Sequence, residues 1–185
     1  MSIYTGRGDE GETDLRDMSR VSKSSHRIEA YGSVDEANAL LGTVRPTGHD
    51  DVDDLLEAIQ NHLHVVQADL ANPDPDPDDP QVESDHTETL EDRIDAFDEE
   101  LEPLQSFILP GGGEAGAALH HARAVVRLAP LRVVDLAPSD PINEAVVPYL
   151  NRLSDLLFTL PPFFNALVLL PPESPTYLSP SPPTY

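Results

Sequence analysis

The residue types that could do chemistry are concentrated near the N-terminus, in the stretch Tyr4–Thr13. This stretch reads YTGRGDEGET and contains three glycines, one arginine and two threonines. Glycines let backbone N–H groups approach a polyanion closely, while hydroxyl and guanidinium groups add hydrogen bonds and positive charge. The GxxxxGK[ST] spacing of a P-loop is missing. The stretch therefore indicates either an anion-binding loop of another kind or a merely flexible glycine-rich terminus.

Cationic groups are scarce, which makes their positions informative. Lys23 is the sole lysine of the chain, and Arg123 and Arg127 lie four residues apart, on one face of a predicted helix. The arginine pair indicates a phosphate clamp, a buried ion pair or a solvated helix edge. Asp35 and Glu36 lie within the apolar pattern of another helix, so we expect one of them to face a basic partner. Because an unpaired buried charge is costly, an Asp35–Arg123 pair is the first expectation.

Other candidate side chains give weaker signals. Phe107 precedes a glycine-rich turn and a helix start, where an aromatic residue usually belongs to the core. Adjacent or alternate histidines on a helix point to different sides, so neither of two pairs makes a good bidentate metal site: His62 with His64, and His120 with His121. Because the chain also lacks cysteine, we expect no transition metal bound by protein side chains.

Five helical patterns must position these groups. Apolar residues recur at three- and four-residue steps over the approximate ranges 26–44, 51–71, 81–101, 114–136 and 141–160. Pro148 should kink the last helix or delay its start, and Pro130 should weaken the fourth by about 3 kcal/mol. No strand pattern is visible. The sequence predicts an all-α fold, a five-helix bundle over residues 26–160, with an N-terminal loop over residues 1–25 and a proline-rich tail over residues 161–185.

The composition is strongly acidic. The 185 residues include 34 acidic and 11 basic side chains, giving a formal net charge of −23. Nucleic acid is excluded as the main partner, because phosphate contacts need a basic surface. Molar salt would screen such charge over about 3 Å, so the chain is either halophilic or an ordinary, highly acidic protein. No signal peptide or membrane helix is expected, because Pro161-Pro162 would break the apolar run 156–170, and we expect a cytoplasmic protein.

Several of these segments, in this order, resemble the cobalamin adenosyltransferases of the PduO type. The resemblance covers roughly residues 3–160. It is carried by short motifs at matching spacings: IYT (3–5) with GDEG (8–11), RVSK (20–23), RIEAYGSVDEAN (27–38), SFILPGG (106–112), ALH (118–120) with Arg123, and YLNRLSD (149–155). Each motif alone is a weak signal, but the set is highly specific.

The resemblance implies a homotrimer of five-helix bundles, with active sites between subunits. It implies an ATP-binding set drawn from the N-terminal loop and two later helices: Thr5, Gly6, Arg7, Gly8, Thr13, Asp14, Lys23, Arg127 and Asn151. It also implies a cobalamin-binding set: Tyr31, Val34, Asp35 and Phe107. Three residues would be catalytic: Phe107, Asp35 and Arg123. Of these, Asp35 and Arg123 would form a salt bridge with each other across the subunit interface. Mg²⁺ would bind through ATP.

The implied reaction transfers the 5′-deoxyadenosyl group of ATP to cob(I)alamin, giving adenosylcobalamin and triphosphate. Phe107 would pack beneath the corrin ring and exclude a lower axial ligand, which makes cob(II)alamin easier to reduce. Cob(I)alamin would then attack C5′ of ATP while Arg127, Lys23 and Mg²⁺ stabilise the leaving triphosphate. A flavoprotein reductase and an adenosylcobalamin-dependent enzyme are the implied protein partners.

Two segments depart from the family pattern. Leu128, Pro130 and Leu131 stand where charged residues that help hold the nucleotide are expected, and the segment 161–164 reads PPFF in place of the usual Ala-Arg-Tyr-Ala. An alternative prediction is therefore a non-catalytic relative that binds or delivers cobalamin. A purely structural acidic trimer is a third prediction. The retained site residues favour the enzyme over both.

Overall fold

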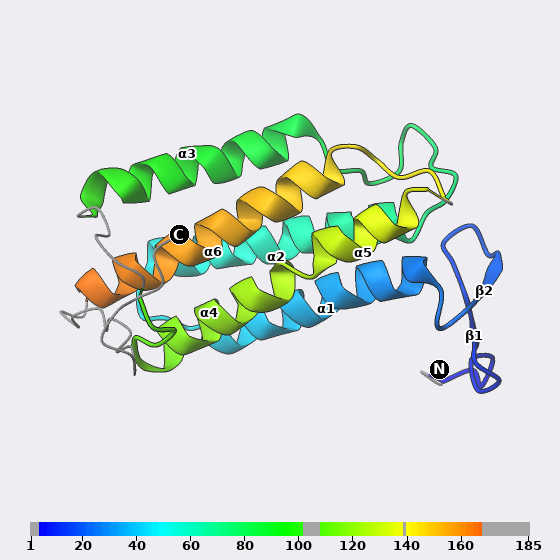
Figure 1. Ribbon diagram of the computed structural model, residues 1–185, viewed down its shortest axis with the longest axis horizontal. Helices are drawn as coiled ribbons and strands as arrows, with labels where there is room; N and C mark the ends of the chain where they lie inside the picture. The colour runs from blue at the N-terminus through cyan, green and yellow to red at the C-terminus, as the bar shows by residue number, and fades with distance from the viewer. Residues whose placement is uncertain (1–3, 102–107, 139, 168–185) are drawn as a thin grey trace, which may run out of the picture.

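The computed structural model describes residues 4–101, 108–138 and 140–167. Its helices are α1 (His26–Val44), α2 (Asp50–Leu70), α3 (Ser84–Glu100), α4 (Gly113–Val126), α5 (Ala129–Leu136) and α6 (Val146–Leu167). An antiparallel hairpin of β1 (Glu12–Asp14) and β2 (Arg20–Ser22) precedes α1. The hairpin lies at one end of the bundle, beside the start of α1 (Figure 1). The predicted helical bundle is confirmed, whereas the expectation that no strand precedes it is wrong.

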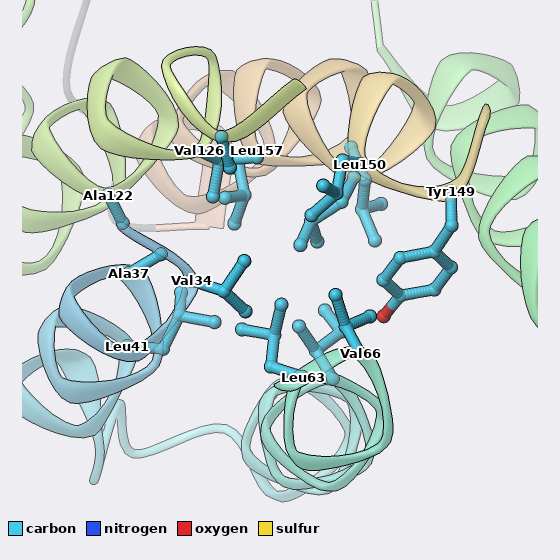
Figure 2. Close-up of a cluster of buried hydrophobic side chains, with 14 of the residues drawn as sticks. Val34, Ala37, Leu41, Leu63, Val66, Ala122, Val126, Tyr149, Leu150 and Leu157 are labelled. Carbon is cyan, nitrogen blue, oxygen red and sulfur yellow. The ribbon is translucent and has the colours of Figure 1, made fainter. Parts of the chain in front are cut away.

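The helices pack around α1 and α6. α1 contacts α2, α4 and α5, while α6 contacts α3, α4 and α5. Buried side chains of four helices meet in the core (Figure 2), among them Val34, Ala37, Leu41, Leu63, Val66, Ala122, Val126, Leu150 and Leu157. Burying a Val or Leu side chain contributes about 1.5–3 kcal/mol, so these apolar faces hold the bundle together. No helix within the described ranges is both long and apolar enough to cross a lipid bilayer.

The fourth predicted helix, residues 114–136, is divided at Arg127 and Leu128. α4 ends at Val126, and Pro130 lies in the first turn of α5. A first-turn proline is tolerated because the helix does not use the amide hydrogen that proline lacks. The expected penalty therefore does not apply, and the described residues contain six helical segments where five were predicted. α6 begins at Val146, later than the predicted start at residue 141, and Pro148 lies in its first turn, as the expected delay requires. α6 then continues through Pro161 and Pro162 to Leu167, so the expectation that these two prolines break the helix and begin the tail is wrong.

A buried arginine fixes the hairpin end of the bundle. Arg27 on α1 is 3% exposed and donates to the carbonyl oxygens of Leu70 at 2.7 Å and Pro141 at 3.2 Å. Asp140 lies 3.9 Å from its guanidinium group. These contacts join α1 to the end of α2 and to the segment before α6. A buried guanidinium is tolerated when its donors are hydrogen-bonded in this way.

The side chains of His62 on α2, His86 on α3 and Tyr149 on α6 form a cluster. The ring centroids of His62 and His86 are 4.7 Å apart, and those of His62 and Tyr149 are 5.9 Å apart. His62 Nδ1 and the Tyr149 hydroxyl are buried and make no hydrogen bond with any described residue. Burial lowers the pKa of His62 below its ordinary value of 6.5, the proximity of His86 lowers it further, and Asp85 opposes the shift.

We expect this cluster to weaken folding in acid. The folded chain binds a proton at His62 less readily than the unfolded chain does, so the contribution of His62 is complete above about pH 6.5 and is lost as the pH falls from that value through the lower pKa of the folded state. Relative to His62→Gln, the unmodified chain should lose stability as the pH falls below about 6.5, measured by urea denaturation at a series of pH values. His64→Gln changes an exposed histidine of the same helix and should follow the unmodified chain. The same pH dependence in all three proteins would contradict this expectation.

Candidate functional site

The N-terminal loop brings Lys23 against its glycines. Gly6 and Gly11 have φ values of +71° and +85°, which residues with a Cβ rarely adopt. The backbone N–H of Lys23 donates to the carbonyl oxygen of Gly11 at 2.9 Å. A Cβ on Gly8 would lie 3.0 Å from Lys23 Nζ. The loop therefore places the Lys23 ammonium group directly against the backbone of Gly8, at a position that a side chain on residue 8 would occupy.

The loop is joined to the hairpin by hydrogen bonds of Arg7. Its Nη2 donates to Asp14 Oδ1 at 2.9 Å, and its backbone N–H donates to Thr5 Oγ1 at 3.4 Å. Thr13 is half-buried and pairs with Val21 across the hairpin. The structure thus gathers the N-terminal members of the predicted ATP-binding set into one loop–hairpin unit: Thr5, Gly6, Arg7, Gly8, Thr13, Asp14 and Lys23.

Most basic side chains are neutralised by carboxylates. Seven of the eleven form ion pairs within the part of the chain that the structure describes. The other four, Lys23, Arg93, Arg123 and Arg127, form none with any described carboxylate, although the chain contains 34 acidic residues. Lys23 and Arg127 belong to the predicted ATP set, and Arg123 to the predicted subunit interface. A cation without a carboxylate partner keeps its charge available for an anionic ligand or a partner group.

Arg123 is held by an aromatic contact. Its guanidinium carbon lies 5.5 Å from the centre of the Phe158 ring of α6, and its Nε is buried and makes no hydrogen bond within the described ranges. Burial, and then the charge of Arg123, lower the pKa of His120. Asp35 is exposed on α1, so the burial argument for its pairing fails. No ion pair joins Asp35 to Arg123 within the described chain, and the predicted pair within one subunit is therefore wrong.

The remaining predicted residues are spread over three helices and a loop. Arg127 follows α4 and Asn151 lies on α6, both exposed, and no described hydrogen bond joins either side chain to the N-terminal loop. Tyr31 on α1 is half-buried, and burial raises its pKa. Val34 is fully buried in the core (Figure 2) and does not reach the surface to contact a ligand. Phe107 lies outside the described residues.

Sequence reasoning missed two features of this region. The two hairpin strands, β1 and β2, have only three residues each. They are too short to show an alternating apolar pattern, so the sequence did not indicate that Arg20 pairs with Asp14. In the sequence, Phe158 is one residue of an apolar run, and its contact with Arg123 depends on how α6 packs against α4. Among the described residues no group of three His, Cys, Asp or Glu side chains could hold a metal ion.

Known proteins similar to this chain point to one family. The sequence model described as cobalamin adenosyltransferase matches residues 3–163. A corrinoid adenosyltransferase of Mycobacterium tuberculosis is 44% identical over 165 residues, which cover 85% of this chain and 86% of that protein. The corrinoid adenosyltransferase PduO of Salmonella typhimurium is 43% identical over 163 residues, which cover 86% of this chain and 48% of that protein.

Solved structures agree with the sequence comparisons. A variant PduO-type ATP:corrinoid adenosyltransferase from Lactobacillus reuteri, complexed with cobalamin and ATP, matches with a TM-score of 0.88 at 32% identity. That match covers 96% of this chain and 100% of the Lactobacillus chain. The match of the family model, the identity to curated enzymes and the shared fold lead to one conclusion: this chain belongs to the cobalamin adenosyltransferase family.

Proposed function

We propose that this chain, a corrinoid adenosyltransferase by its relatives, transfers the 5′-deoxyadenosyl group of ATP to cob(I)alamin and releases triphosphate. The structural observation that carries the proposal is the absence of described carboxylate partners for Lys23, Arg123 and Arg127 in a chain of net charge −23. Such a chain repels a nucleoside triphosphate unless local positive charge is kept free. The family resemblance supports a cytoplasmic reaction, with electrons from a flavoprotein reductase and the product passed to an adenosylcobalamin-dependent enzyme.

In this proposal the N-terminal loop holds the triphosphate. Lys23, Arg7 and the amides of the glycine loop supply positive charge and donors, and the hydroxyls of Thr5 and Thr13 supply further hydrogen bonds. Mg²⁺ carried by ATP adds charge neutralisation. Arg127 and Asn151 complete the set from α4 and α6. These groups act most strongly on the charge that grows on the leaving triphosphate, and holding C5′ close to cobalt lowers the barrier through proximity.

The cobalamin side of the proposed site is built from α1 and the segment before α4. Phe107 excludes a lower axial ligand from cobalt, and Tyr31 and Asp35 contact the corrinoid. Val34 is left out because it is buried in the core. Asp35, exposed on α1, pairs with Arg123 of a neighbouring subunit, which gives both charges a partner that one chain does not provide. The site is therefore complete only in a homotrimer.

The substitutions around α5 are compatible with turnover. Pro130 occupies a first-turn position that tolerates it. Leu128 and Leu131 are 54% and 61% exposed, so they change the surface next to Arg127 and leave the fold intact. Arg132 still joins α5 to α1, through an ion pair of 3.4 Å with Glu29.

The decisive experiment is an anaerobic assay. Chemically reduced cob(I)alamin, MgATP and the protein are mixed in molar KCl, and the visible spectrum is followed. A change to the adenosylcobalamin spectrum that requires both ATP and the protein supports the proposal. Binding of cobalamin without consumption of ATP by a folded trimer would assign the chain to the non-catalytic binders, and binding of neither would leave a structural role.

The exposed apolar residues of α5 should contribute to trimer assembly. Leu128, which directly precedes α5, and Leu131 and Val134 within it recur every three residues and are more than half exposed, as expected of a face that another subunit covers. Leu131→Asp should convert most of the trimer to monomer at micromolar concentration, measured by light scattering after size exclusion. Ala96→Asp, on an exposed face of α3, should remain trimeric. A trimeric Leu131→Asp would move the interface away from α5.

Molar salt should stabilise the fold if the acidic composition is a halophilic adaptation. The repulsion among the 34 carboxylates is screened over about 3 Å at 1 M salt, compared with about 30 Å at 0.01 M. The thermal unfolding midpoint should therefore rise by more than about 10 °C between 0.01 M and 2 M KCl. An unchanged midpoint would identify an acidic protein that does not depend on salt.

A further inference from the structure

We propose that Arg20 is a positioning residue for the N-terminal loop, a role that rests on the proposed function of that loop in binding triphosphate. Arg20 is the first residue of the hairpin strand β2 and lies opposite Asp14, the last residue of β1. The hairpin lies clear of the helical core at one end of the bundle (Figure 1). A side chain in this place can order the loop without taking part in the packing of the bundle.

The guanidinium group of Arg20 donates hydrogen bonds to three different acceptor groups. Its Nε donates to Glu12 Oε2 at 3.2 Å, its Nη1 to Asp14 Oδ1 at 3.5 Å, and its Nη2 to the carbonyl oxygen of Arg7 at 3.0 Å. The first two contacts lie within the hairpin. The third reaches the backbone of the glycine loop, so one planar group fixes the distance between the loop and both strands.

Arg7 is the residue through which Arg20 acts. Its carbonyl oxygen accepts from Arg20, and its own guanidinium group donates to Asp14 at 2.9 Å. Asp14 therefore has two cationic partners. A carboxylate repels phosphate oxygens, so Asp14 is poorly suited to the direct ATP contact that the resemblance implied. Its contacts instead assign it the role of positioning Arg7.

Because Asp14 has two arginine partners, Arg7 can move from Asp14 to a phosphate without leaving the Asp14 carboxylate unpaired. When a triphosphate enters, it competes with Asp14 for the guanidinium group of Arg7. If Arg7 moves to the phosphates, Arg20 stays with Asp14, and the Arg20 contact to the Arg7 carbonyl keeps the loop backbone in place. Ordering glycine-rich backbone costs conformational entropy, so a loop fixed in advance binds ATP more tightly.

The contacts of Arg20 are too exposed to serve global stability. Its side chain is 34% exposed, and those of Glu12 and Asp14 are 56% and 24% exposed. Ion pairs in such positions contribute about 0–1 kcal/mol. Replacing Arg20 can therefore loosen the N-terminal loop without appreciably lowering the stability of the helical bundle.

The test compares Arg20→Gln and Arg20→Lys with Arg16→Gln. Arg16 lies in the turn of the same hairpin and its exposed ion pair goes to Asp79, away from the glycine loop. We expect Arg20→Gln to raise the KM for ATP about tenfold with kcat changed less than about threefold, the pattern of lost binding energy that is shared by ground and transition states. Arg20→Lys should recover part of the affinity through one retained donor, and Arg16→Gln should match the unmodified enzyme.

A second readout does not need turnover. Hydrogen exchange at the amides of Asp9 and Gly11, which donate to Gly6 and Gly8 within the loop, should be faster in ATP-free Arg20→Gln than in Arg16→Gln, while the amides of α1 and α6 exchange as before. Unchanged loop exchange, or a KM for ATP equal to that of Arg16→Gln, would overturn the role of Arg20. If the unmodified protein shows no adenosyl transfer, the proposed function fails, and the exchange comparison still decides whether Arg20 orders the loop.

Discussion

Replacing Lys23 by alanine should lower kcat/KM for ATP by about 10²–10³, the loss seen when one donor to a developing negative charge is removed. Lys23 is the sole lysine of the chain, and its ammonium group lies against Gly8 with no described carboxylate partner. Its charge is therefore available to the triphosphate as the C5′–oxygen bond breaks. The measurement is the initial rate of adenosylcobalamin formation at varied ATP.

Two further variants make this result specific to Lys23. Lys23→Arg keeps the charge but not the compact ammonium geometry, and should recover part of the rate. Arg93→Ala removes another cation without a described carboxylate partner, from an exposed position on α3, and should leave the rate unchanged. Activity of Lys23→Ala within threefold of the unmodified enzyme, or an equal loss in Arg93→Ala, would show that local charge beside the glycines does not drive the reaction.

The second large effect concerns stability. Arg27→Ala should lower the free energy of unfolding by about 3 kcal/mol, because two carbonyl oxygens lose a charged donor and the packing of the buried aliphatic stem is lost. Both acceptors, on Leu70 and Pro141, lie in segments that Arg27 ties to α1. Guanidinium chloride denaturation at constant pH and salt measures the change.

Arg16→Ala provides the matched control for this effect. It removes an exposed arginine whose ion pair with Asp79 also joins distant parts of the chain, and such a pair contributes about 0–1 kcal/mol. If both variants lose the same stability, the contribution of Arg27 comes from charge alone and not from its burial.

Local patterns in the sequence were sufficient to predict the helices. α1 and α2 follow the predicted ranges within one residue at each end, because a regular apolar stripe records which face each helix buries. The delayed start of α6 was predictable from Pro148, because proline is best tolerated in a first helical turn, but the continuation of α6 through Pro161 and Pro162 was not. The break at Arg127 and Leu128 was not, since Pro130 fits either a damaged helix or the first turn of a new one. The choice between them depends on what α4 and α5 pack against.

The predicted site residues divide in a similar way. The glycines and Lys23 were visible as an unusual composition, and the structure places them together because the hairpin folds the chain back on itself. Val34 was assigned to cobalamin from its motif, yet it faces the core, since a motif gives the order of residues but not the side of a helix on which each one lies. The pairing of Asp35 with Arg123 inside one chain failed because it assumed that Asp35 is buried.

The sequence by itself determined the helical class, the order of the motifs and, through them, the family resemblance. These properties depend on residue types at short separations, where burial periodicity and backbone preference act directly. The tertiary structure alone decided which groups became partners. The meeting of His62 with His86, the stacking of Arg123 on Phe158 and the attachment of Arg20 to the glycine loop each depend on how separate segments pack, and contacts of that kind leave no local period in a sequence.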